Sequence, residues 1–163
     1  MDYKTLSTEP EVVNVVISCI LDKKLNPSDY GEYDPCKFSG IVLRDDKSCL
    51  LIYHSTKINI TGVKSLLEAE QVIHRNLPDI NIISSRIVNI TATASILPEI
   101  NFKDVYNNEN FSWEPELFPG IIYRKRKHVA TLFRSRKVNL TGFKAVEEIA
   151  PFFNEFLKSL PLI

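Results

Sequence analysis

KINITGVK occupies residues 57–64, and 80 positions later the chain reads KVNLTGFK at residues 137–144. Five of these eight positions are identical. The same offset aligns two more pairs of segments: FSGIVLR (38–44) with FPGIIYR (118–124), and IYHS (52–55) with LFRS (132–135). Upstream, VNV at 13–15 matches VNI at 88–90 with an offset of 75, because the loops of the two copies differ in length. So many matches in register indicate a duplicated structural unit of roughly 75–80 residues.

Each copy predicts the same order of elements: a strand, an irregular or short helical stretch, three more strands and an amphipathic helix. The expected strands cover 11–20, 38–44, 48–54 and 57–61, then 85–95, 118–124, 128–134 and 137–141. Asp45-Asp46-Lys47 is typical of a turn. Apolar residues follow helical spacing at Leu66, Leu67, Ala69, Val72 and Ile73, and at Ala145, Ile149, Phe152, Phe153 and Phe156. Pro151 predicts a bend or a late start of the second helix.

Alternation along the strands separates two faces. The predicted core face holds Val13, Val15, Ile17, Ile41, Leu43, Leu50, Ile52, Ile58 and Ile60. The opposite face mixes aromatic rings, hydroxyls, amides and cations. In the first copy it holds Asn14, Val16, Ser18, Phe38, Val42, Arg44, Leu51, Tyr53, Ser55, Lys57, Asn59 and Thr61. In the second it holds Asn89, Thr91, Thr93, Phe118, Ile122, Arg124, Thr131, Phe133, Ser135, Lys137, Asn139 and Thr141. Such a mixture suits a binding surface better than a core or a solvated face.

Composition indicates a globular chain of 163 residues, 44% hydrophobic and 25% charged. The order of predicted strands and helices gives the fold class, α/β (α+β). We expect one domain, 1–163, with repeats at about 11–80 and 84–163. The net charge of zero argues against strongly electrostatic nucleic-acid binding. However, residues 1–80 carry 9 basic and 12 acidic residues, a net of −3, whereas 81–163 carry 11 and 8, a net of +3. The basic run at 124–127, with Arg134, Arg136 and Lys137, is either a solvated hairpin or a DNA-backbone contact.

Other features of the sequence exclude several classes of function. No apolar run approaches a bilayer span, and the polar N-terminus does not predict secretion. Cys19, Cys36 and Cys49 are interpreted as reduced intracellular thiols. His54, His74 and His128 lack metal-site spacing, and no phosphate loop or nucleophile elbow occurs. The sequence therefore predicts that the protein is not an enzyme and binds no metal, cofactor, membrane or small-molecule substrate.

WEPELFPGIIYR at 113–124 closely resembles the second-repeat signature of the TATA-binding protein family. Weaker similarities are EYDPCKF at 32–38, the VNV and VNI strands, and the two S-x-K-x-x-x-T-G-x-K segments. Together they cover the chain from about residue 11 to its end. The resemblance implies a pseudo-symmetric saddle, in which two repeats form a curved ten-stranded antiparallel sheet with helices on the convex face. Because the stretch between Asn14 and Phe38 is short, the first helical segment is expected to be trimmed.

The resemblance also implies binding to A·T-rich promoter DNA from the minor groove. TATA-binding protein is itself an established example of kinking by inserted side chains, so this mechanism comes with the resemblance. The wedge positions are Phe38, Tyr53, Phe118 and Phe133, for which packing in a core is the alternative. The base-contact positions are Asn14, Val16, Leu51, Asn59, Thr61, Asn89, Thr91, Thr131, Asn139 and Thr141. The backbone-contact positions are Arg44, Ser55, Lys57, Lys64, Arg124, Ser135, Lys137 and Lys144.

Glu114, Glu116 and Leu117 match the loop, called the stirrup, that the family presents to transcription factor IIB, which implies recruitment of RNA polymerase. Nuclear localisation, or a viral transcription site in a host cell, follows from that role. The family has Val where this chain has Asn59, Asn139 and Thr91, so the DNA-facing surface is more polar here. Two alternatives stay open: a degenerate module that regulates transcription, or acts as a decoy, through protein contacts alone, and a module recognising damaged or hybrid duplexes.

Overall fold

The computed structural model describes residues 6–107 and 109–161. The chain divides into two compact units. One comprises Asn14–Asn89 and is called the first-repeat unit; the other comprises the chain on either side of that segment and is called the second-repeat unit. The division crosses two long strands, β1 (Glu11–Leu21) and β5 (Ile82–Ser95), so each unit contains part of both.

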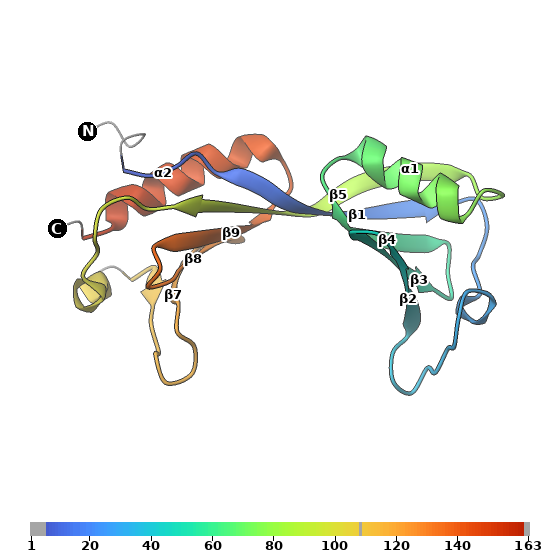
Figure 1. Ribbon diagram of the computed structural model, residues 1–163, viewed down its shortest axis with the longest axis horizontal. Helices are drawn as coiled ribbons and strands as arrows, with labels where there is room; N and C mark the ends of the chain where they lie inside the picture. The colour runs from blue at the N-terminus through green and yellow to red at the C-terminus, as the bar shows by residue number, and fades with distance from the viewer. Residues whose placement is uncertain (1–5, 108, 162–163) are drawn as a thin grey trace. The chain divides into compact units, whose positions relative to one another are not determined.

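In the first-repeat unit, β2 (Gly40–Asp45), β3 (Ser48–Tyr53), β4 (Lys57–Val63) and β1 follow one another in the antiparallel order β2-β3-β4-β1. A short 3-10 helix, η2 (Pro27–Asp29), lies between β1 and β2 in sequence, and α1 (Leu66–Asn76) follows β4. Facing isoleucines and leucines such as Leu50 and Ile60 pair across the strands and are fully buried. The helix lies over one face of these strands (Figure 1).

In the second-repeat unit the order is β5-β9-β8-β7-β6. The strands are β6 (Phe111–Ser112), β7 (Ile121–Lys125), β8 (His128–Leu132) and β9 (Lys137–Phe143). The helical segments are η3 (Phe102–Asn107), η4 (Val146–Glu148) and α2 (Ile149–Ser159). The helix-covered core of this unit is aromatic, since Tyr123, Phe143, Phe152 and Phe156 are all buried.

The described residues form a nine-stranded antiparallel sheet, so the expectation of ten strands is wrong. The difference lies in the connection before β2, which covers residues 22–39, or 18 residues, whereas residues 96–120 between β5 and β7 number 25. In the longer connection, Phe111 packs its ring 4.8 Å from that of Tyr123 and forms β6. The position 80 residues earlier is Gly31, which has no ring to pack. The first helical segment, which the sequence predicts to be short, is η2 with three residues, whereas η3 of the second copy has six.

The predicted core face is confirmed with two exceptions. Val13 is 43% exposed, because the pairing of β1 with β4 ends at Val15 and no β4 partner lies opposite Val13. Leu43 is half-buried.

Both predicted helices form, with corrections at their first turns. Leu66 and Leu67 are 38% and 66% exposed rather than core residues, whereas Ala69, Val72 and Ile73 are buried. The α1 N-terminus is capped, since the Ser65 side chain accepts a hydrogen bond from the Glu68 N–H. In the second copy, residues before Ile149 form η4, so Pro151 falls in the first turn of α2, where its missing N–H costs little. The predicted late start is confirmed.

Candidate nucleic-acid interface

The strand faces opposite the helices carry the mixed set of side chains predicted from alternation. In the first-repeat unit, Val42, Leu51, Asn59 and Ser18 form one cross-strand row. In the second-repeat unit, the equivalent row is Ile122, Thr131, Asn139 and Thr93. All eight side chains are half-buried or exposed. Each unit therefore presents a continuous open face of strands.

An aromatic pair lies at one end of the open face of the first-repeat unit. The rings of Phe38 and Tyr53 are 6.1 Å apart and tilted by 58°. Phe38 precedes β2 rather than beginning it, and its N–H donates to the Asp34 carbonyl at 3.1 Å. Gly40 makes room for the pair, because a Cβ there would lie 2.9 Å from Tyr53 Cδ1 and 2.4 Å from the Ile52 carbonyl oxygen.

The second-repeat unit repeats this construction. The rings of Phe118 and Phe133 are 6.0 Å apart at 67°, and the Phe118 N–H donates to the Glu114 carbonyl at 2.9 Å. A Cβ at Gly120 would lie 2.9 Å from Phe118 and 3.3 Å from Phe133. Phe38 and Phe118 are each 42% exposed. The structure thus places the four predicted wedge rings as two half-exposed pairs and not within a core.

The predicted base-contact residues occupy the open faces, and some already have partners. Asn14 Oδ1 accepts the Gly62 N–H at 2.7 Å, which leaves its NH₂ group to donate elsewhere. The hydroxyls of Thr91 and Thr141 are 3.3 Å apart. Asn89, Val16, Leu51, Thr61 and Thr131 are half-buried on the same faces.

Most predicted backbone-contact residues are exposed. None of the six cations Arg44, Lys57, Lys64, Arg124, Lys137 and Lys144 forms an ion pair with another residue in 6–107 or 109–161. Ser135 is exposed, whereas the Ser55 hydroxyl accepts the Lys57 N–H at 3.0 Å within a turn. Arg44 donates to the Cys49 sulfur, at 3.6 Å. Cations that face no internal carboxylate are available to oppose phosphates.

The basic segment of the second copy is not one patch. Lys125 pairs with Glu155 of α2, and the Arg134 guanidinium lies 5.1 Å from the centre of the Phe102 ring. Arg136 donates to the Leu97 carbonyl at 2.7 Å. Of this segment, only Arg124 and Lys137 match the open-face positions predicted for backbone contact.

Glu114, Glu116 and Leu117 lie in an exposed turn, and Leu117 is 81% exposed. The base of the loop is fixed by a cluster that sequence reasoning missed. Trp113 meets Phe102 edge-on at 5.6 Å, and Arg134 lies 5.6 Å from the Trp113 ring. The signal was present in the sequence, since the chain's one tryptophan directly precedes the loop and Arg134 stands where the first copy has His54.

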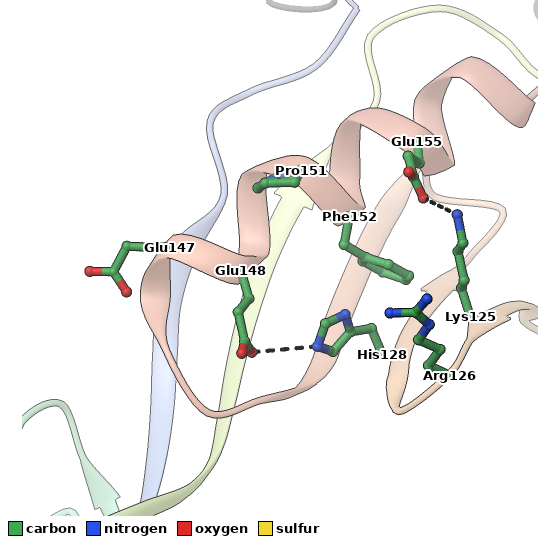
Figure 2. A pocket seen from close by; sticks show the side chains of 8 residues that line it. All are labelled: Lys125, Arg126, His128, Glu147, Glu148, Pro151, Phe152 and Glu155. Carbon is green, nitrogen blue, oxygen red and sulfur yellow. Dashed lines mark hydrogen bonds and ion pairs between the residues drawn. The ribbon is translucent and has the colours of Figure 1, made fainter.

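A groove on the helix side of the second-repeat unit was also missed. It lies between the β7–β8 hairpin and the start of α2 and is lined by Lys125, Arg126, His128, Glu147, Glu148, Pro151, Phe152 and Glu155 (Figure 2). The Lys125–Glu155 pair, at 2.6 Å, and the His128–Glu148 pair, at 3.4 Å, bridge it. Lys125 lowers the pKa of Glu155, and the Lys144 N–H is the main cause of the lowered pKa of Glu148.

No group of three or more potential metal ligands occurs in the described parts of the chain. No helix within residues 6–107 and 109–161 has the length and apolar character needed to cross a bilayer. Cys19 is buried, Cys36 is exposed and Cys49 is half-buried. Burial raises the pKa of the Cys19 thiol.

Comparison with known proteins gives a consistent result over nearly the whole chain. The family model described as transcription factor TFIID, or TATA-binding protein, matches residues 9–83 and again 84–162. A TATA-box-binding protein of Methanococcus vannielii is 36% identical over 93% of this chain and 95% of its own length. One from Methanocaldococcus jannaschii is 34% identical over 96% of each chain. The solved structure of a Methanococcus jannaschii TBP aligns with a TM-score of 0.80, at 34% identity, over 93% of this chain and 97% of that one.

Proposed function

Because the chain belongs to the TATA-binding protein family, we propose that it is a transcription initiation factor that binds A·T-rich promoter DNA in the minor groove and kinks it. The observation that carries this proposal is the duplicated pair of half-exposed aromatic rings, Phe38 with Tyr53 and Phe118 with Phe133. Rings inserted between base steps unstack them and bend the duplex. We propose that both units act on one duplex.

The remaining open-face side chains have complementary roles in this proposal. The half-buried groups Asn14, Val16, Leu51, Asn59, Thr61, Asn89, Thr91 and Thr131, with Thr141 and the exposed Asn139, meet base edges. Amide NH₂ groups suit adenine N3 and thymine O2, the acceptors that an A·T pair offers in this groove. The cations at Arg44, Lys57, Lys64, Arg124, Lys137 and Lys144, with Ser55 and Ser135, contact phosphates and fix register.

We further propose that the exposed loop with Glu114, Glu116 and Leu117 binds a factor resembling transcription factor IIB and, through it, RNA polymerase. Two carboxylates steer a basic partner, and Leu117 supplies an apolar anchor. This role would locate the protein at the site of transcription, which is the nucleus or a viral transcription site in a host cell.

Bending of end-labelled duplex DNA, followed by energy transfer, tests the main proposal. Phe118→Ala with Phe133→Ala is expected to remove the kink made by that pair, to leave the one made by Phe38 and Tyr53, and to reduce bending more than Lys57→Ala does. Lys57→Ala is expected to weaken binding to all sequences similarly and to reduce the slope of log affinity against log salt by about one. Binding without any change in end-to-end distance would show that the aromatic pairs are not wedges.

A second candidate is a module that binds protein alone, favoured by the net charge of zero and the amides on the open faces. Absence of binding to any duplex at low salt would select it.

A further inference from the structure

Two carboxamides occupy equivalent positions in the middle of the open faces. Asn59 lies on β4 between Leu51 and Ser18, and Asn139 lies on β9 between Thr131 and Thr93. Among the described residues, neither side chain has a hydrogen-bond partner, in contrast to Asn14, whose Oδ1 accepts the Gly62 N–H. These two carboxamides lie at equivalent positions of the repeat and have no hydrogen-bond partner within the described parts of the protein. They are therefore suited to hydrogen bonds with a bound molecule.

The chemistry of the minor groove indicates what that partner is. Every base pair offers acceptors there, but only guanine adds a donor, its N2 amino group. An apolar side chain against this group would leave a buried donor unsatisfied, which disfavours G·C pairs. A carboxamide has both NH₂ donors and a carbonyl acceptor, so it satisfies either kind of base pair.

The surroundings of the two amides differ. Asn139 is exposed and is flanked by the hydroxyl side chains of Thr131 and Thr93. Asn59 is half-buried, and one neighbour is the apolar Leu51. A guanine amino group beside Asn59 would therefore also meet a hydrocarbon surface, whereas beside Asn139 it meets hydroxyl oxygens.

We infer that Asn139 makes this protein tolerant of a G·C base pair, and that the tolerance is confined to the part of the DNA site contacted by the second-repeat unit. This inference rests on the proposed minor-groove binding. It defines the preferred DNA as a site in which one half is restricted to A·T pairs and the other accepts a guanine.

The test uses one A·T-only duplex and a series in which each base pair in turn is replaced by G·C or by inosine·cytosine, at one stated salt concentration. Inosine lacks the N2 amino group, so each matched pair of duplexes isolates that donor. For the unaltered protein, we expect at least one position where the G·C and inosine·cytosine duplexes bind within about threefold of each other. At that position Asn139→Val should lower the ratio of G·C affinity to inosine·cytosine affinity about tenfold.

Asn59→Val is the control, because it makes the same change at the equivalent position of the first-repeat unit. Whatever it does to overall affinity, it should leave the ratio of G·C affinity to inosine·cytosine affinity at the tolerated position unchanged. Valine favours strands, so both variants are expected to fold. If Asn139→Val leaves every ratio unchanged while A·T binding persists, or if the unaltered protein rejects guanine everywhere, the inference is wrong and the proposed function stands. If no duplex is bound, both fail.

Discussion

The two repeats share a backbone design and fill it with different side chains. A two-residue turn with a positive φ joins β2 to β3 at Asp46 in the first copy and β7 to β8 at Arg126 in the second. In each, a glutamate in the helical segment accepts the backbone N–H of a lysine four residues earlier. Beneath the helices, however, Val63, Val72 and Ser48 of the first copy correspond to Phe143, Phe152 and His128 of the second.

The charge pairs between hairpin and helix are reversed. In the first-repeat unit, Asp45 of the hairpin binds Arg75 of α1 at 2.9 Å. In the second, Lys125 of the hairpin binds Glu155 of α2 at 2.6 Å. Because the same contact is made with opposite signs, the fold needs complementarity at this place and not a particular residue.

The loops before the wedge rings differ most in what they present. Asp34 and Glu114 both accept the N–H of the following phenylalanine, so the turns match. After a proline that both copies share, the intervening residues are Cys36 and Lys37 in one copy and Glu116 and Leu117 in the other. The two copies therefore share the loop backbone and the aromatic rings, but their loops expose different side chains to other molecules.

The largest expected effect concerns the aromatic core of the second-repeat unit. Phe143 is fully buried, and its ring stacks on His128 at 4.5 Å and meets Phe152 at 5.6 Å. Phe143→Ala should lower the free energy of unfolding by about 3–5 kcal/mol, from lost burial and the cavity left behind. Val63→Ala, at the equivalent position, removes only two buried carbons and should cost about 2 kcal/mol.

Urea titration of both variants measures this difference. Phe143→Val, which introduces the first-repeat side chain, is the matched control and should still lose stability because Phe152 and His128 do not shrink with it. Equal losses in the Phe143→Ala and Val63→Ala variants would show that the aromatic cluster adds nothing to the shared packing.

Sequence alone could predict the features that follow from periodicity and repetition. Alternation placed Ile17, Leu50 and Ile60 in the core, and the repeat offset aligned both hairpins. It could not predict the exposure of Val13, because that depends on where the pairing of β1 with β4 ends. Nor could it show that Leu66 and Leu67 lie at an exposed first turn, since their helical spacing fits the buried stripe equally well.

The candidate site shows the same division. The aromatic pairs could be found because the repeat marks them, whereas the partners of Arg134 and Arg136 depend on η3 and on the loop after β5. Those connections differ in length between the copies, so no repeat position predicts them. The groove at Glu148 and Glu155 was missed because its two sides are distant in sequence.

An intermediate effect is expected at the stirrup loop. Glu114→Arg with Glu116→Arg should leave DNA affinity equal or slightly higher, because two negative charges are removed from the neighbourhood of DNA. It should weaken the ternary complex with the cognate initiation factor at least about 30-fold, ~2 kcal/mol, since like charges then face the partner. Gel-shift titration with DNA and the factor measures both affinities.

Glu32→Arg with Asp34→Arg makes the same charge change in the first copy and should leave recruitment intact. Normal recruitment by the Glu114, Glu116 variant would place the partner surface elsewhere, on the helical side of the molecule.

The smallest expected effect concerns the reversed charge pairs. Hydrogen bonds from Arg75 and then Asn76 lower the pKa of Asp45, and Lys125 lowers that of Glu155. Because both folded-state pKa values lie below the unfolded ones, these pairs stabilise the protein above about pH 5 and cease to do so as pH falls through the lowered values. Exposed pairs contribute little, so both variants that neutralise a carboxylate should be only slightly destabilised.

Asp45→Asn should nevertheless lower the free energy of unfolding more than Glu155→Gln does. The Asp45 side chain is 16% exposed and also binds Asn76, whereas the Glu155 side chain is 50% exposed. Added salt should diminish the Glu155→Gln difference first, since water and ions reach that pair more freely. Stability measured by urea titration between pH 3 and pH 7 separates the two, with the variants converging on the unaltered protein at the acidic end. If Glu155→Gln proves the more costly, the two pairs are not equivalent contacts with reversed sign, and the second-repeat groove depends on its ion pair in a way the first repeat does not.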